Sequence, residues 1–175
     1  AVIAIDMTLH GIRPEETELA PFYIGNSPWA DVANERTFNA DYINNVTFEL
    51  GPDGVTDESG FWVLNFINLL TQRDNYRQAQ ADFSVLTVTV PHISIDGDML
   101  PDLDGSNIQW VSISGGSVIG PAFVAAEPMV NSAFLSVGGG GIARLLDGSE
   151  YYGPQIQAFL NALAGVEPGS LEYEQ

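Results

Sequence analysis

The stretch that decides the fold of this chain is Trp110-Val111-Ser112-Ile113-Ser114-Gly115-Gly116-Ser117. Residues 107–113, which lead into it, are rich in apolar side chains and have strand character. Residues 118–126 follow with helical character and end before Pro128. A sharp turn between a strand and a helix is the setting in which a nucleophilic serine is displayed. Three serines of this stretch could occupy the tip of such a turn.

Steric room selects one of the three serines. In so tight a turn, the residues two before and two after the tip must be small to avoid a collision. Ser112 has Trp110 at one of these positions, and Ser117 has Ile119. Both neighbours are too large, so Ser114 is the only serine that satisfies the rule. The small residues that flank it are Ser112 and Gly116.

Ser114 at the tip predicts a nucleophile, with the backbone N–H of Gly115 directed at a developing oxyanion near a helix N-terminus. The usual pattern is Gly-x-Ser-x-Gly, and here Ser112 replaces the first glycine. The alternative is a strand-to-helix turn without chemistry, used for packing or for binding phosphate. A P-loop is excluded because no Gly-x-x-x-x-Gly-Lys pattern occurs.

Outward from this turn, strands alternate with helices. Such an order predicts an α/β fold with a parallel sheet and helices on both of its faces. The expected strands are residues 1–5, 107–113 and 132–137, of which the first and last should be buried. The expected helices are residues 61–89 (ended by Pro91), 118–126, 142–146 and 155–163 (closed by Gly165).

Residues 13–60 show little periodicity and carry four prolines and many Asn and Asp residues. A plain loop of that length is uncommon in a compact domain, so we expect an irregular insertion or lid with its own packing. The chain also begins with the apolar run Ala1-Val2-Ile3-Ala4-Ile5 and without a Met or a basic leader. A core strand is an unusual first element, which predicts that the chain is a piece of a longer protein.

Composition excludes several classes of function. The 175 residues include 23 Asp and Glu against 5 Lys and Arg, a net charge of -18, and no Cys. Binding to nucleic acid or to an anionic membrane needs a basic surface, so we expect neither partner. Disulfide and thiolate chemistry are impossible, and no apolar run reaches the roughly 18 residues of a transmembrane segment. The acidity suggests a protein that is extracellular or on the outer cell surface, and solubility alone explains an acidic surface about as well.

Longer sequence strings on both sides of the strand-to-helix turn at Ser114, called the elbow from here on, carry a resemblance to a known family. The chain resembles the bacterial extracellular lipases and phospholipases of the virulence-factor lipase type, which belong to the α/β-hydrolase superfamily. The acidic turn at residues 96–105, which precedes the elbow, and the elbow itself also match. The other matching strings are AIDMTLHGI at 4–12, ERTF at 35–38, GPDGV at 51–55, NLLTQRDN at 68–75 with RQA at 77–79, and GGGIARLLDGS at 139–149.

The resemblance implies a serine carboxylester hydrolase whose substrate is a lipid or another ester. Residues 1–175 would form a partial α/β-hydrolase domain, with Ser114 as nucleophile and the Gly115 N–H as oxyanion donor. In this superfamily the acid and the histidine of the triad follow the serine. Here His10 and His92 both precede Ser114. The triad histidine and acid are therefore expected outside this chain, and a companion fragment would be needed for activity.

The pair His10-Gly11 could be mistaken for the oxyanion His-Gly of lipases. It follows Asp6 at the end of an apolar run, in the arrangement Asp-x-x-x-His-Gly. We interpret it as a structural turn. His92, next to Pro91 on a loop, is interpreted as a solvated or locally bonded residue.

Two acidic turns are candidate calcium sites, because Ca²⁺ prefers several oxygen ligands and alternating loop carboxylates can converge on one ion. A solvated acidic loop is the alternative for both. A second hypothesis for the whole chain follows from them: a non-catalytic, calcium-stabilised extracellular module on an α/β-hydrolase scaffold. Two features favour this second hypothesis: no histidine follows Ser114, and Ser112 stands where the motif usually has glycine. The predicted ligands are Asp96, Asp98, Asp102 and Asp104 at the first turn, and Asp53 and Asp57 at a weaker second one.

Overall fold

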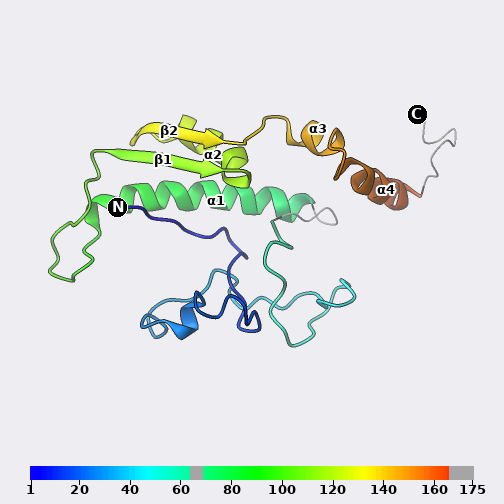
Figure 1. Ribbon diagram of the computed structural model, residues 1–175, viewed down its shortest axis with the longest axis horizontal. Helices are drawn as coiled ribbons and strands as arrows, with labels where there is room; N and C mark the ends of the chain where they lie inside the picture. The colour runs from blue at the N-terminus through cyan, green and yellow to red at the C-terminus, as the bar shows by residue number, and fades with distance from the viewer. Residues whose placement is uncertain (64–68, 166–175) are drawn as a thin grey trace. The chain divides into compact units, whose positions relative to one another are not determined.

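The computed structural model describes residues 1–63 and 69–165 and shows a mixed α/β fold (Figure 1). The described chain divides into two compact units. The first comprises residues 1–108 and 127–130, and the second comprises residues 109–126 and the chain from 131 onward. Within the described residues, no helix combines the length and the hydrophobicity that a bilayer crossing requires.

A small parallel sheet of two strands, β1 (Ile108–Ile113) and β2 (Val130–Ser136), forms the centre of the second unit. Helix α2 (Gly115–Ala126) connects the two strands and covers one face of β1. The Trp110 ring lies 4.9 Å from that of Phe123, which is only 3% exposed. Gly120 permits this contact, because a Cβ there would lie 2.7 Å from the indole nitrogen. An aromatic pair across one strand and one helix is thus the core of this unit.

The predicted strands and helices of this unit are confirmed, with shifts at their ends. Helix α2 begins three residues earlier than expected, directly after Ser114. Helices α3 (Ile142–Asp147) and α4 (Gly153–Ala164) follow β2. Gly165 closes α4 as expected, with φ +67° and its N–H donating to Ala162 O.

The prediction that residues 132–137 are buried is wrong. Phe134 is 65% exposed, and Val111 and Ile113 on β1 are similarly exposed. Their exposure has a simple cause: α2 packs on the side of β1 that carries Trp110, while Val111 and Ile113 point to the opposite side. An apolar strand sequence indicates which faces can be buried, but not whether a covering element is present.

The long helix α1 (Leu69–Thr89) belongs to the first unit. It ends in the 3₁₀ helix η2 (Val90–His92), whose Pro91 stops the α-helical bonding as predicted. The predicted start at Phe61 is wrong, because residues 61–63 form a turn. Phe66, which was expected on the apolar face, lies outside the described residues.

The buried side of α1 is largely polar rather than apolar. Gln72, Asn75, Ala79 and Thr87 are each less than a tenth exposed, whereas Leu70 is 64% exposed. Thr87 and Gln72 donate within the helix, to Phe83 O at 2.8 Å and to the Tyr76 hydroxyl at 3.4 Å, whereas Asn75 bonds to a loop, whose backbone groups need hydrogen-bond partners. The Asn75 side-chain amide donates to the backbone oxygen of Trp62 at 2.9 Å.

A second polar cluster ties α1 to the start of the chain. The Asp82 carboxylate pairs with the guanidinium of Arg36, which also donates to the hydroxyl of Thr8 at 3.0 Å. Gln78 donates to the same carboxylate at 2.9 Å. Arg36 O in turn accepts the N–H of Leu9 at 2.9 Å. One ion pair thus fixes two loops against the middle of the helix.

Residues 1–5 form no strand, so the prediction of a buried first strand is wrong. Val2 is 97% exposed and Ile3 is 42% exposed. A β-branched apolar run becomes a strand only where a neighbouring strand pairs with its backbone. In the described chain both strands of the sheet lie beyond residue 107.

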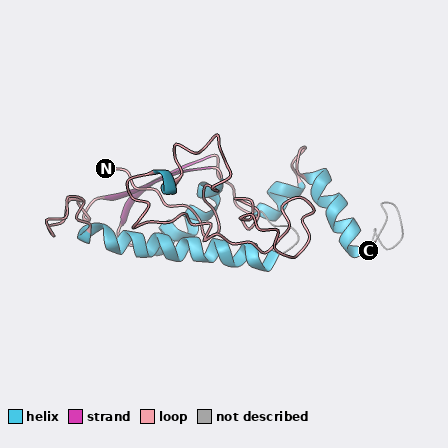
Figure 2. Cartoon of the chain, turned by 90° about the horizontal axis from the view of Figure 1, so that it is seen from below, coloured by secondary structure: helices cyan, strands magenta, loops and turns pink. Residues whose placement is uncertain are grey.

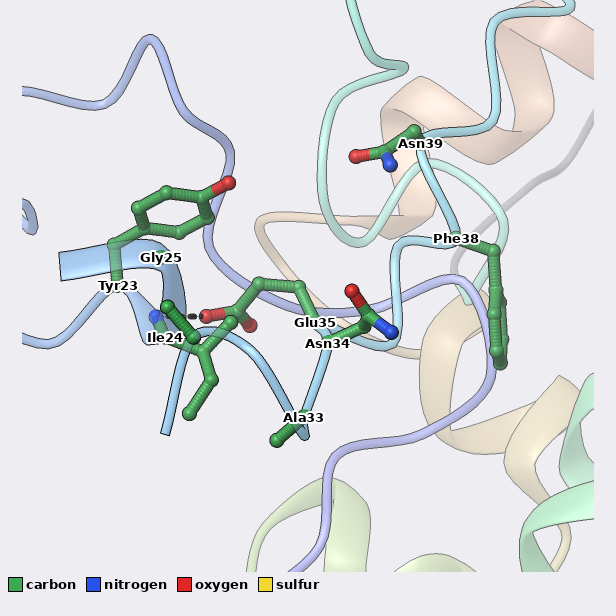
Figure 3. A pocket seen from close by; sticks show the side chains of 9 residues that line it. Tyr23, Ile24, Gly25, Ala33, Asn34, Glu35, Phe38 and Asn39 are labelled. Carbon is green, nitrogen blue, oxygen red and sulfur yellow. Dashed lines mark hydrogen bonds between the residues drawn. The ribbon is translucent and has the colours of Figure 1, made fainter. Parts of the chain in front are cut away.

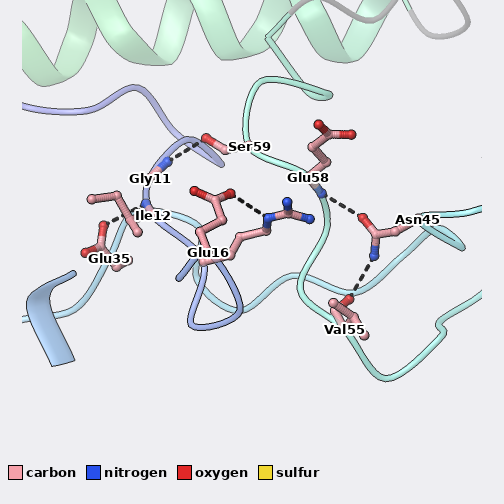
Figure 4. A network of polar contacts seen from close by, with 9 residues as sticks. Gly11, Ile12, Glu16, Glu35, Asn45, Val55, Glu58 and Ser59 are labelled. Carbon is pink, nitrogen blue, oxygen red and sulfur yellow. Dashed lines mark hydrogen bonds and ion pairs between the residues drawn. The ribbon is translucent and has the colours of Figure 1, made fainter. Parts of the chain in front are cut away.

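Residues 13–60 are irregular, as predicted (Figure 2). Their regular structure consists of the 3₁₀ helix η1 (Ile24–Asn26) and an isolated bridge between Ile43 and Leu50. Side chains that bond to the backbone hold the rest (Figure 4). Ser59 accepts the N–H of Gly11 at 3.0 Å, and Asn45 bridges Val55 O and the N–H of Glu58.

Asp57 is the most buried carboxylate of this segment, with 4% of its surface exposed. Its carboxylate accepts the N–H groups of Tyr42 and Ile43 at 3.0 and 3.1 Å and the indole N–H of Trp62 at 3.1 Å. Three donors from two chain segments therefore converge on one side chain.

We predict that Asp57→Ala lowers the free energy of unfolding by at least about 2 kcal/mol, because several buried donors lose their acceptor. The measurement is urea unfolding followed by tryptophan fluorescence. Asp31→Ala, at an exposed position of the same segment, is the control and should change stability by less than about 0.5 kcal/mol. Equal effects of the two substitutions would contradict the role given to Asp57.

Candidate active site

Ser114 lies at the tip of the predicted strand-to-helix turn, between the last residue of β1 and the first of α2. Its φ is +52°, a left-handed conformation that costs a residue other than glycine about 1–2 kcal/mol. Its side chain is exposed. A strained, exposed serine at this place in the chain has the backbone geometry that a nucleophile elbow requires.

Backbone hydrogen bonds fix Ser114 from both sides. Its N–H donates to Ser136 O at the end of β2, at 3.0 Å. Its carbonyl oxygen accepts the N–H groups of Ser117 at 2.8 Å and of Val118 at 3.1 Å, the first bonds of α2. The turn is therefore part of the sheet on one side and part of the helix on the other.

The steric rule that selected Ser114 has a direct counterpart in the structure. A Cβ at Gly116 would lie 3.2 Å from the Cβ of Ser112, closer than most such contacts. Ser112, which stands where the motif usually has glycine, makes two hydrogen bonds with its hydroxyl group. Its Oγ accepts the indole N–H of Trp110 at 2.9 Å and shares a hydrogen bond of 3.0 Å with the hydroxyl of Ser117, which is 1% exposed. Ser112 and Ser117 thus form a support beneath Ser114.

Gly115 is the first residue of α2 and therefore one of the four whose N–H has no acceptor within the helix. A Cβ at this position would meet no atom within 4 Å, so the space around the residue is open. The Ser114 N–H is already bound to Ser136 O. Of these two successive amides, that of Gly115 is the one that can stabilise an oxyanion.

The end of β2 lies directly beside the elbow. Gly138 packs against the first turn of α2, where a Cβ on it would lie 2.6 Å from Ser117 O. Pro121 has no N–H with which to make the usual helical bond to that same oxygen. Parallel strands bring their carboxyl ends to one edge of a sheet, which is where α/β proteins place their ligands.

Both histidines belong to the first unit, so the second unit contains the serine without a histidine. His10 Nδ1 lies 3.7 Å from a carboxylate oxygen of Asp6. A Cβ on Gly11 would lie 2.9 Å from a Glu35 carboxylate oxygen, so this turn admits only glycine without rearrangement. These contacts favour a structural role for the His10-Gly11 turn.

The Asp96–Asp104 turn is organised by local hydrogen bonds. Asp102 accepts the N–H of Ile95 at 2.6 Å, and Asp98 that of Leu100 at 2.7 Å. The hydroxyl of Ser106, with its N–H, lowers the pKa of Asp104. In residues 1–63 and 69–165, no three acidic or histidine side chains come together as a group that could hold a metal ion. Asp96 makes a similar local bond to the N–H of Asp98.

At the second acidic turn, Asp53 and Asp57 lie in one segment but accept different amides. Asp53 accepts the N–H groups of Asn45 at 2.8 Å and Val55 at 2.9 Å, and the bond from Asn45 is the main cause that lowers the pKa of Asp53. Asp57 is occupied by the three buried donors described above. Both carboxylates act as acceptors for loop amides, and calcium binding at either turn stays a prediction.

Sequence reasoning missed a cavity of about 350 Å³ within the first unit (Figure 3). Glu35 lies in its wall and accepts the N–H groups of Ile24 at 2.8 Å and Ile12 at 3.1 Å. Two further lining residues, Phe38 and Asn39, both have φ +52°. No sequence signal announces this cavity, because irregular turns form it. Its lining comprises Tyr23, Ile24, Gly25, Ala30, Ala33, Asn34, Glu35, Phe38 and Asn39.

Comparisons of this chain with protein-family profiles, with curated proteins and with solved structures find no match. The geometry around Ser114 is therefore the feature of this chain that points to a function.

If Ser114 is strained, replacing it with glycine should relieve the strain. We predict that Ser114→Gly raises the free energy of unfolding by about 1 kcal/mol, because glycine adopts positive φ without penalty. Urea unfolding monitored by circular dichroism measures the change. Ser132→Gly, inside β2, is the matched control and should lower stability by about 0.5–1 kcal/mol. A loss of stability in Ser114→Gly as large as in the control would show that the turn is not strained.

Proposed function

We propose that this chain carries the nucleophile of a serine ester hydrolase of the lipase or phospholipase type. The observation that supports the proposal is the geometry of Ser114, which is exposed, has φ +52° and lies between a parallel strand and the helix that follows it. The close approach of Gly116 to Ser112 adds the steric signature of a nucleophile elbow.

In the proposed reaction, the hydroxyl oxygen of Ser114 attacks the carbonyl carbon of an ester. The hydroxyl proton passes to a histidine from outside this chain, and the carbonyl oxygen becomes an oxyanion that the Gly115 N–H stabilises. Collapse of the tetrahedral intermediate breaks the bond to the alcohol, which leaves with that proton. Water then hydrolyses the acyl-serine and releases a carboxylic acid.

We further propose that the two-stranded sheet is part of an α/β-hydrolase sheet. The exposed apolar residues Val111, Ile113 and Phe134 support this reading, because isolated strands rarely leave such side chains in water. In this arrangement a companion fragment, which also brings the triad histidine and acid, would cover them. The charge of -18 suits an extracellular or cell-surface enzyme.

The test is labelling of the full-length protein with a fluorophosphonate, which phosphonylates an activated serine. We expect a single adduct on the peptide that contains Ser114, and at least a hundredfold slower labelling in Ser114→Ala. Peptide mass spectrometry locates the adduct, and hydrolysis of a short-chain nitrophenyl ester gives a parallel activity measurement.

Two neighbouring serines provide the controls. Ser117→Ala and Ser112→Ala remove hydroxyls that support the turn, so both variants should still be labelled on Ser114, at a reduced rate. An enzyme that keeps its full esterase activity in Ser114→Ala would refute the proposal.

Calcium at Asp96, Asp98, Asp102 and Asp104 is proposed as a structural addition rather than as part of the reaction. If it binds, 1 mM Ca²⁺ should raise the melting temperature, and Tb³⁺ should show sensitised luminescence from a nearby aromatic ring. Asp98→Asn combined with Asp102→Asn should abolish both signals. If the unsubstituted protein shows neither signal, that result contradicts calcium binding and, with it, the hypothesis of a calcium-stabilised module.

A further inference from the structure

Contacts made by the two chain neighbours of Val137, Ser136 and Gly138, hold this residue beside the elbow. The carbonyl of the peptide that joins Ser136 to Val137 accepts the N–H of Ser114 at 3.0 Å. On the other side, Gly138 packs so closely on the first turn of α2 that a Cβ would lie 2.6 Å from Ser117 O. The position of Val137 is therefore fixed by the residues that build the elbow.

Ser114 and Val137 occupy equivalent places in the two strands. Each is the first residue beyond the carboxyl end of its strand, since β1 ends at Ile113 and β2 at Ser136. Each also has a left-handed backbone, with φ +52° at Ser114 and +49° at Val137. Because the strands are parallel neighbours, the two residues lie at the same edge of the sheet.

A valine is an unfavourable choice for this backbone. Residues branched at Cβ are rarely found with positive φ, and glycine or asparagine would adopt it more easily. Packing does not compensate, because the Val137 side chain is 77% exposed. Backbone strain clusters at active sites and ligand clamps, and Val137 shows it directly beside the candidate nucleophile.

We propose that Val137 is a specificity-determining residue that forms one wall of the acyl-binding site next to Ser114. The inference rests on the proposed function of Ser114. An aliphatic side chain at this place contacts the acyl chain of an ester, and its volume limits which acyl chains can lie against the reacting carbonyl. Discrimination by such an apolar wall reaches roughly 10–200-fold for a change of one methylene group.

The experiment measures kcat/KM of the full-length enzyme for nitrophenyl acetate, nitrophenyl octanoate and nitrophenyl isobutyrate, a branched acyl ester. Val137→Phe should lower the octanoate-to-acetate ratio by at least about tenfold, because the larger ring fills the space of the longer chain. Val137→Gly should raise the ratio at least threefold for a branched acyl ester relative to acetate. Because glycine adopts φ +49° without strain, this second variant folds even if the first does not.

Val85→Phe is the matched control, since Val85 is 62% exposed on α1, in the other unit. It should leave both ratios unchanged. If fluorophosphonate still labels Ser114 but neither Val137 variant changes a ratio by more than twofold, the inference about Val137 is wrong and the proposed function stands. If Ser114 is not labelled in the unsubstituted enzyme, the proposed function fails, and the inference fails with it.

Discussion

The second unit depends on one constraint, the left-handed backbone of Ser114. With this conformation Ser114 alone joins β1 to α2, so strand, serine and helix are consecutive. The turn is so tight that residues 112 and 116 nearly touch, which is why neither can be large. The turn joins β1, which carries Trp110, to α2, which carries Phe123, and these two rings are in contact. Position 120 must be glycine, because a Cβ there would collide with the indole of Trp110.

The first unit is organised by a different device, in which carboxylates accept backbone N–H groups. Asp57, Glu35 and Asp53 each accept at least two such bonds from loop residues. Loops have no ladder or helix to satisfy their amides, and a carboxylate offers up to four acceptor positions. Part of the acidity of this chain therefore has a structural use. With 5 basic residues in the sequence, cations cannot partner most of these acids.

The sequence alone predicted the elements around the elbow, because their signals are local. Small residues at 112 and 116, apolar residues before them and Pro128 after them constrain the backbone directly. It failed for residues 1–5 and for the burial of β2, because burial depends on partners that no local pattern names. Nor did it indicate that Gln72, Asn75 and Thr87 would be buried on α1, because Asn75 bonds to the backbone of Trp62, far from the helix in sequence. The positions of Val137 and Glu35 depend on contacts between turns, which no local sequence pattern encodes.

The net charge imposes a condition on the proposed reaction. A charge of -18 disfavours any anion, and the tetrahedral intermediate of ester hydrolysis is an anion. At physiological ionic strength, charges on the surface more than about 8 Å away are largely screened, so groups close to the carbonyl decide the outcome. The Ser114 N–H is committed to Ser136 O, which leaves the Gly115 N–H at the start of α2 as the adjacent donor. In the proposed reaction, the N–H groups at the start of α2 therefore have to offset the negative field of the nearby acidic groups at the transition state.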